Sequence, residues 1–423
     1  MKIKSIKFLS DYRQFLKGQK FNFAIDKEDG LVSSNPNFSV LVGRNGSGKT
    51  TLMSLIPTLF HNIERYNRKI PADFEMIYNI TQFEKDIEVK INHYQNLIRE
   101  TVTGLFDNIQ LVPKRNAQTN DFTMIDRNQS YVEYHLFHKF TPMSVVTSTF
   151  SLHGEYPISR PRNFIGHQIV SPQTITHIYG ENHYEIGSIS RGLLRFVNMF
   201  YESKSEIKEL LKLFDLKFTN RLLYRLAGDY DAWVSINRDW LKKHQVEIEM
   251  VEAYLNDIEF ERYNRKICLS NMSSGEKMLL LRAISILNSI EDNSIVIIEE
   301  PELHLDQVWN KQLTTLFKIL YKKYKCHIII ATHDYSIINT VPQRNIITLK
   351  NGKQETLKEN TFLASYDDLF KTLYGNKFST NQIEEEYISS IEKKSIKQLE
   401  DDYEILGNSV YKYLVYKEIK KRS

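Results

Sequence analysis

The chain has 423 residues and a net charge of +4, with 56 Lys and Arg against 52 Asp and Glu. This mildly basic balance is compatible with a nucleic-acid partner without indicating one. No apolar stretch reaches the length that spans a bilayer, and the two cysteines, Cys268 and Cys326, lack metal-ligand spacing and favour a reducing compartment. We therefore expect a cytoplasmic protein without a membrane partner, long enough for one large head or two to three modules.

The first predicted elements surround a phosphate loop. Residues 1–155 are β-rich, with polar and apolar residues alternating at 87–94. A short apolar strand at 39–42 leads into the pattern G-x-x-x-x-G-K-[ST], and a helix is expected after it. Glycines let backbone N–H groups turn inward around the phosphates, and the helix N-terminus adds its dipole. The predicted nucleotide-binding residues are Gly43, Arg44, Asn45, Gly46, Ser47, Gly48, Lys49, Thr50 and Thr51.

Two side chains of this loop carry its chemistry. Lys49 supplies a positive charge for the β- and γ-phosphate oxygens, and Thr50 offers a hydroxyl to Mg²⁺. An ordinary glycine-rich turn is the alternative, and the flanking strand and helix make it the weaker interpretation. The predicted cofactors are therefore ATP and Mg²⁺.

An insertion is predicted at 156–276. Prolines and glycines interrupt residues 156–188, and a helical pattern runs from Arg191 to about Tyr263, so we expect a mainly helical lobe. The lobe ends in Ser273, Ser274, Gly275 and Glu276, directly before a strong helical run. Ser273 or Ser274 can cap that helix, and hydroxyls, a glycine and a helix N-terminus together make an anion site. Taken alone, simple capping is the stronger interpretation of these four residues.

Residues 277–354 return to alternating helix and strand. The β-branched run at 295–298 is typical of a strand buried on both faces of a parallel sheet, where acidic residues at the carboxyl end meet ligands. We expect Glu299 to hold Mg²⁺, directly or through water, and Glu300 to orient or deprotonate the attacking water. An acidic helix cap is the alternative. His333 follows another core strand and is a candidate γ-phosphate switch, although a lone His is usually structural.

The last predicted region, 355–423, is mainly helical and highly charged. Its acidic clusters lack further metal-ligand residues and are interpreted as solvated helix faces. The segment 411–422 is amphipathic, basic and aromatic. It is either a docking helix with a solvated tip or a contact for a partner chain or nucleic acid.

Taken in order, these elements resemble an ATP-binding-cassette-type ATPase of the SMC/RecF/OLD-like group. The resemblance implies an α/β fold, a P-loop NTPase head with a mixed sheet, an antiparallel β-rich N-terminal part and an inserted helical lobe. It also implies a homodimer, or a higher oligomer built from it, in which ATP is sandwiched between one phosphate loop and the partner chain's residues 273–276. Residues 303–306 match the family's D-loop, which places His304 and Asp306 near the dimer seam. The opening segment resembles RecF-like heads, where Arg13 would reach a phosphate; a solvated surface Arg is the alternative.

One family feature is missing. The strand leading into the helical lobe usually ends in Gln, but residues 143–151 contain none. Gln82 and Gln168 are weak alternatives, and a hydroxyl is another way to build this contact.

Three functions follow from the resemblance. The interval between Lys49 and Ser273 is long for a transporter subunit, and no sustained heptads indicate an SMC arm. The tail weakly resembles the stand-alone ATPase of bacterial antiphage systems of the Septu type. We therefore expect an ATP-binding and ATP-hydrolysing dimeric switch that controls a separate effector, a nuclease, in antiphage defence. The alternatives are a RecF-like ATPase acting directly on DNA and, less favoured, an energising subunit of a transporter.

Overall fold

The computed structural model describes residues 1–12, 16–23, 37–64, 70–82, 84–94, 97–103, 109–115, 122–125, 131–132, 140–149, 156, 174–178, 186–202, 204–225, 232–250, 254–303, 305–357, 359–375, 382–407 and 409–422. The chain divides into two compact units, Met1–Leu363 and Ala364–Ser423. The boundary lies between Leu363 and Ala364, so the strand Lys353–Glu355 and the residues that follow it up to Leu363 belong to the first unit.

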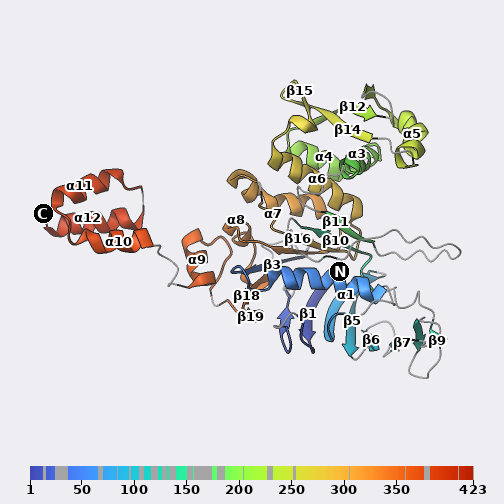
Figure 1. Cartoon of the computed structure of the whole chain (residues 1–423), viewed down its shortest axis with the longest axis horizontal. Helices are drawn as coiled ribbons and strands as arrows, with labels where there is room; N and C mark the ends of the chain where they lie inside the picture. Colours follow the sequence, from blue (N-terminus) through green and yellow to red (C-terminus); the bar gives the residue numbers. More distant parts are fainter. Residues whose placement is uncertain are drawn as a thin grey trace. The chain divides into compact units, whose positions relative to one another are not determined.

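A seven-stranded sheet forms the centre of the first unit (Figure 1). Its order is β11 (Thr174–Ile178), β10 (Ser144–Ser148), β16 (Ile295–Glu299), β17 (His327–Ala331), β3 (Asn37–Gly43), β18 (Ile346–Lys350) and β19 (Lys353–Glu355). All neighbours are parallel except β18 and β19. Strands β10, β16 and β17 are buried along their whole length, and the apolar, β-branched runs of β16 and β17 predict this burial. Ala331 pairs with both Glu299 and Leu41, so three strands end at one edge.

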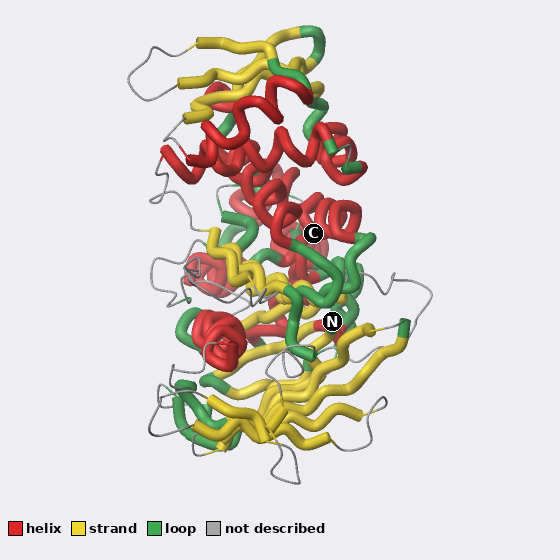
Figure 2. Tube along the Cα trace, turned by 90° about the vertical axis from the view of Figure 1, so that its right-hand side faces the viewer, coloured by secondary structure: helices red, strands yellow, loops and turns green. Residues whose placement is uncertain are grey.

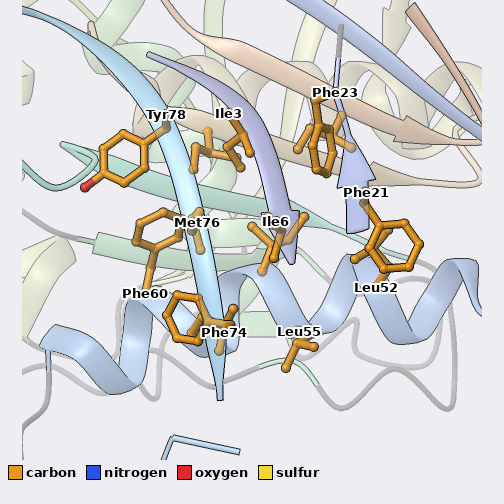
Figure 3. Close-up of a cluster of buried hydrophobic side chains, with 14 of the residues drawn as sticks. Ile3, Ile6, Phe21, Phe23, Leu52, Leu55, Phe60, Phe74, Met76 and Tyr78 are labelled. Carbon is orange, nitrogen blue, oxygen red and sulfur yellow. The ribbon is translucent and has the colours of Figure 1, made fainter. Parts of the chain in front are cut away.

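An antiparallel sheet and one helix cover one face of this centre. The strands are β2 (Lys20–Asn22), β1 (Lys2–Phe8), β4 (Phe74–Gln82), β5 (Lys85–Tyr94), β6 (Leu97–Thr103), β7 (Ile109–Arg115), β8 (Phe122–Ile125) and β9 (Tyr131–Val132). Helix α1 (Lys49–Glu64) lies between the two sheets, and Leu52, Leu55 and Phe60 pack in one core with residues of both (Figure 3). The alternation in β4 buries one face of the strand against α1.

Helices cover the other face of the parallel sheet. Helices α6 (Ser274–Ser289) and α7 (Gln307–Tyr321) lie next to it, and α3 (Ile186–Tyr201) and α4 (Ser205–Leu213) pack on them (Figures 1 and 2). A four-stranded antiparallel sheet follows, in the order β13 (Ala232–Ser235), β12 (Lys217–Arg225), β14 (Tyr254–Arg262) and β15 (Arg265–Cys268), with α5 (Arg238–Met250) beside it in sequence. Short segments η2 (Leu269–Asn271), α8 (Tyr335–Ile338) and η3 (Gln343–Asn345) complete the unit.

The prediction of a mainly helical lobe at 156–276 is therefore wrong in part. Helices α3 and α4 confirm the helical pattern up to Leu213, but from 217 to 268 the chain forms four strands and one helix, α5. A bulge explains the misinterpretation, because Asn220 adopts φ 57° and the register shifts between Phe218 and Arg221. The shift breaks the period of two by which strands are recognised in a sequence.

The second unit contains α9 (Tyr366–Tyr374), α10 (Gln382–Ile391), α11 (Ile396–Ile405) and α12 (Val410–Arg422). Val415 of α12 is fully buried against Ile391 and Leu399. Arg422 donates to Glu418 at 2.7 Å and to the Lys394 carbonyl at 2.7 Å. Helix α12 thus packs within its own unit, as expected if the segment 411–422 is a docking helix. Among the described helices, none is long and apolar enough to cross a membrane.

Candidate functional site

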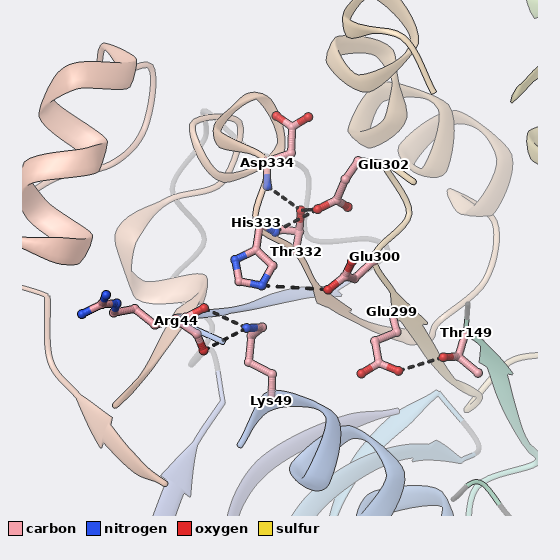
Figure 4. Close-up of polar contacts among 10 residues, drawn as sticks. Arg44, Lys49, Thr149, Glu299, Glu300, Glu302, Thr332, His333 and Asp334 are labelled. Atoms are coloured by element: carbon pink, nitrogen blue, oxygen red, sulfur yellow. Dashed lines mark hydrogen bonds and ion pairs between the residues drawn. The ribbon is translucent and has the colours of Figure 1, made fainter. Parts of the chain in front are cut away.

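The site lies where β3, β17 and β16 end side by side (Figure 4). The phosphate loop follows β3, the segment 332–334 follows β17, and Glu300 follows β16. The structure brings together four residues predicted from sequence: Lys49, Glu299, Glu300 and His333. Burial lowers the pKa of Lys49, while the charges of Glu300, Glu299 and Glu302 raise it. Three carboxylates therefore surround one lysine at this edge of the sheet.

The phosphate loop is folded tightly enough to hold an anion. Lys49, the first residue of α1, points its Nζ at the carbonyl oxygens of Gly43 and Arg44, at 2.7 and 3.4 Å. A Cβ on Gly43 would lie 2.4 Å from the Leu349 carbonyl oxygen, so this position needs glycine. The Ser47 hydroxyl is buried and has no hydrogen-bond partner among the described residues. A buried donor without a partner, a cation and a helix N-terminus together fit a phosphate group.

Glu299 is buried, with 3% of its surface exposed. Its Oε2 accepts hydrogen bonds from Thr149 Oγ1 at 2.8 Å and from the Tyr156 hydroxyl at 3.0 Å. Burial and the charge of Glu299 raise the pKa of Tyr156 well above its usual value, so the phenol stays a donor. Because both donors use Oε2, Glu299 keeps Oε1 for another partner, and with Thr50 at the start of α1 it fits a Mg²⁺ ion.

Thr149 lies near the position where the family has Gln. It directly follows β10, the neighbour of β16, so a hydroxyl occupies the end of the strand that leads toward the lobe. Gln82 ends β4 in the antiparallel sheet, and Gln168 lies outside the described residues. The sequence interpretation missed Tyr156, because nothing in its neighbourhood marks it as a partner of Glu299.

Glu300 faces a different environment. Its backbone is left-handed, with φ 43°, and its N–H donates to the Ala331 carbonyl at 2.8 Å. Its Oε1 lies 3.9 Å from His333 Nε2. Burial raises the pKa of Glu300, as does Glu299, whereas Lys49 lowers it. Burial lowers the pKa of His333, as does Lys49, which favours a neutral imidazole at pH 7.

The segment 273–276 begins α6. Of the two candidate serines, Ser273 is the N-cap, and its hydroxyl accepts from the Glu276 N–H in a capping box. Arg262 of β14 pairs with Glu276 at 2.9 Å. These contacts hold the backbone of Ser274 and Gly275 in the first turn of the helix. Simple capping is therefore present; it uses the Glu276 N–H, and the N–H groups of Ser274 and Gly275 are the ones that could meet an anion.

Other predicted residues have different outcomes. Arg13 and His304 lie outside the described residues. Asp306 is the N-cap of α7 and accepts from the N–H groups of Val308 and Trp309. One residue of this region had no predicted role: Glu302 accepts hydrogen bonds from the Thr332 hydroxyl and from the His333 N–H. Its place in the turn after β16 is the signal that marks it.

Residues 221–339 match the family described as "AAA domain, putative AbiEii toxin, Type IV TA system". This span contains residues 273–276, Glu299, Glu300 and His333, and does not include the phosphate loop. None of the curated proteins compared with the chain matches it.

Similar solved structures are distant in sequence. The SMC head domain from Thermotoga maritima is 14% identical, with a TM-score of 0.39, and covers 84% of this chain and 97% of its own. An SMC head bound to the C-terminal winged-helix domain of ScpA is 15% identical, with a TM-score of 0.40, and covers 88% of this chain and 100% of its own. An ATP-binding cassette, a post-hydrolysis dimer bound to ADP and Pi, is 14% identical, with a TM-score of 0.32, and covers 86% and 99%.

The fold class predicted from the sequence is confirmed, with a mixed sheet, an antiparallel part and an insertion. The phosphate loop after β3 and the acidic pair after β16 give the chain the fold of a P-loop NTPase head, within which residues 221–339 match the AAA-domain family model.

Proposed function

We propose that the chain binds ATP with Mg²⁺, hydrolyses it, and uses the two states to open and close a homodimer. The observation that carries the proposal is the meeting of Lys49, Glu299, Glu300 and His333 at one edge of the parallel sheet. Lys49 and the N–H groups of the loop bind the phosphates, and Thr50 and Glu299 hold the metal. A bound Mg²⁺ would neutralise charge on the β- and γ-phosphate oxygens.

Glu300 is the general base of the proposed reaction. Burial and Glu299 raise the pKa of this carboxylate, which makes it a better proton acceptor, and Lys49 opposes the shift. His333 lies beside it and is positioned to contact the γ-phosphate. Arg13 remains a proposed phosphate contact.

The proposed dimer uses residues 273–276 in trans. Ser273, Ser274, Gly275 and Glu276 form the N-terminal turn of α6, a site for the γ-phosphate of the nucleotide on the facing chain. The capping box and Arg262 support this role, because a turn that is already ordered loses little entropy when it binds.

We further propose that the output of the switch is delivered by a separate effector, a nuclease, in antiphage defence. The lobe from α3 to β15 is compact, which supports an ATPase that acts through a partner. The description of the matched family names a toxin of a toxin–antitoxin system. To test the effector, an adjacent nuclease gene is co-expressed, and DNA cleavage is measured with and without ATP. Binding of DNA by the purified chain alone, steeply weakened by salt, favours the RecF-like alternative instead.

The ATPase proposal itself is tested with Glu300→Gln. The amide keeps the size of the side chain but cannot accept a proton, so we expect ATP affinity to persist while turnover falls by about 10²- to 10⁴-fold. The dimer should persist with ATP in size-exclusion chromatography. Glu404→Gln, an exposed change in α11, is the control. Parental turnover in Glu300→Gln would assign the base to another residue.

A further inference from the structure

Two segments of the site are joined by one carboxylate. Glu302 lies in the turn after β16, and its Oε1 accepts from Thr332 Oγ1 at 2.6 Å and from the His333 N–H at 2.8 Å (Figure 4). Both donors belong to the segment after β17. Nearby, the Glu300 N–H donates to the carbonyl of Ala331, the last residue of β17, at 2.8 Å.

The Thr332 hydroxyl extends this connection. It donates to Glu302 and accepts from the Asp334 N–H at 2.9 Å. Asp334 in turn accepts from Asn310 Nδ2 of α7 at 2.7 Å. The backbone on both sides of His333 is therefore fixed, by Glu302 on one side and by α7 on the other.

The carboxylate of Glu302 is committed to this contact. Burial raises the pKa of Glu302, and the bonds from Thr332 and His333 oppose that effect. Its Oε2 is buried and has no partner among the described residues. An inward carboxylate costs desolvation, and the Thr332 and His333 donors offset part of that cost through Oε1, with a further contribution from the backbone of Glu302 itself.

We propose that Glu302 is a positioning residue that holds the His333 imidazole opposite Glu300. It acts through backbone and hydroxyl contacts and does not itself touch nucleotide. The proposal rests on the proposed ATPase function, because the gap between Glu300 and His333 is where the attacking water and the γ-phosphate would meet.

The test compares Glu302→Ala with Glu302→Gln. Alanine removes the acceptor, so we expect kcat to fall at least about tenfold, since small displacements of catalytic groups are costly. ATP affinity should change much less than kcat, because the phosphate loop keeps its own contacts and Glu302 is the weakest of the three carboxylate charges acting on Lys49. Glutamine keeps an Oε1 that accepts both bonds and should restore most of the loss. Equal losses in both variants, or parental kcat in Glu302→Ala, would overturn the proposal.

A double-mutant cycle with His333→Ala tests the route of the effect. If Glu302 acts through His333, then Glu302→Ala should lower kcat by less than about twofold in the His333→Ala background. Fully additive losses would show that Glu302 acts elsewhere. Thr332→Val removes only the hydroxyl donor, and an intermediate loss of kcat is expected. This variant replaces Glu302→Ala in the test if Glu302→Ala unfolds at the assay temperature.

A second readout does not depend on hydrolysis. In histidine-labelled, nucleotide-free protein, the imidazole resonances of His333 should shift in Glu302→Ala and much less in Glu404→Ala. Unchanged His333 resonances in Glu302→Ala would contradict the proposed clamp. A parent protein that binds ATP without hydrolysing it would contradict the proposed function while leaving the resonance test intact.

Discussion

Glu299 and Glu300 are chemically identical neighbours, yet the structure gives their carboxylates different surroundings. Glu299 is buried and accepts two hydroxyl hydrogen bonds, whereas Glu300 is half-buried and faces Lys49 and His333. The left-handed backbone of Glu300 costs about 1–3 kcal/mol. The side chain of Glu300 points toward His333, whereas that of Glu299 points toward Thr149 (Figure 4). The pair could be predicted from the sequence, but its division of roles depends on Thr149 and Tyr156, which lie far away in the chain.

The Tyr156 contact leads to a prediction about metal binding. Tyr156→Phe removes one of the two donors to Glu299, and a hydrogen bond to a charged group contributes about 1.5–3 kcal/mol. We expect Mg²⁺-dependent ATP affinity to fall, with the metal-free affinity unchanged, because the change reaches Glu299 and not the phosphate loop. Calorimetric titration of ATP with and without Mg²⁺ measures both values.

The matched control for this variant is Tyr387→Phe. It also removes a tyrosine–carboxylate hydrogen bond, from Tyr387 to Asp402 at 2.7 Å, but within the second unit. A similar loss of Mg²⁺-dependent affinity in both variants, or a loss in neither, would show that Tyr156 has no specific role at the metal site.

Among the elements, those with simple periodicity were predicted and those with irregular backbone were not. The unbroken apolar runs of β16 and β17 and the helix after the phosphate loop were all recognised. In β14, both Asp257 and Glu259 are buried beside Ile258 and Phe260, so polar and apolar residues do not separate by face. Asp257 is buried because its carboxylate accepts from the Ser270 N–H and hydroxyl, a long-range contact that local patterns do not contain.

Strand β17 carries a buried histidine with a pH consequence. His327 Nδ1 accepts from the Ile3 N–H at 3.1 Å, so its Nε2 carries the hydrogen and donates to Ser39 Oγ at 2.9 Å. A proton on Nδ1 would oppose the Ile3 N–H. Burial, and the nearby charge of Lys2, lower the pKa of His327 to about 3 from its ordinary 6.5. The neutral ring therefore stabilises the fold fully above pH 6.5, and this contribution is lost as the pH falls from 6.5 toward 3.

His327→Asn isolates this effect. The amide oxygen can still accept from Ile3, but the Ser39 contact and the titrating ring are lost. We expect the variant to be less stable at pH 7.5 by about 1–3 kcal/mol. Between pH 6.5 and 5, the free energy of unfolding of the parent should fall by up to about 1.4 kcal/mol per pH unit more steeply than that of the variant. Denaturant titrations at each pH measure the difference; parallel curves would contradict a neutral His327.

At the scale of the whole molecule, the proposed dimer makes a prediction about mixed chains. Lys49→Ala disables the phosphate loop, and Ser274→Arg blocks the turn at the start of α6. In a mixed dimer, one site combines both defects and the other combines neither. With random pairing, half of the dimers are mixed and have one of two sites intact, so about a quarter of the parental ATPase rate should return.

Each variant measured alone is the control for this experiment and should show almost no turnover. Sites formed within one chain would give no recovery on mixing, even when mass photometry or tagged pull-down proves that mixed dimers form. That result would leave the binding roles of Lys49 and Thr50 standing and remove the role of residues 273–276 in trans.

The strand order places β17 between β3 and β16, so the phosphate loop and the acidic pair are not direct neighbours. His333 follows the middle strand and has Lys49 on one flank and Glu300 on the other. A ligand that reaches only one flank leaves the other side of the middle strand unchanged. From the proposed γ-phosphate contact of His333, we therefore expect the central histidine to meet a nucleotide only when both flanking strands hold it at the same time.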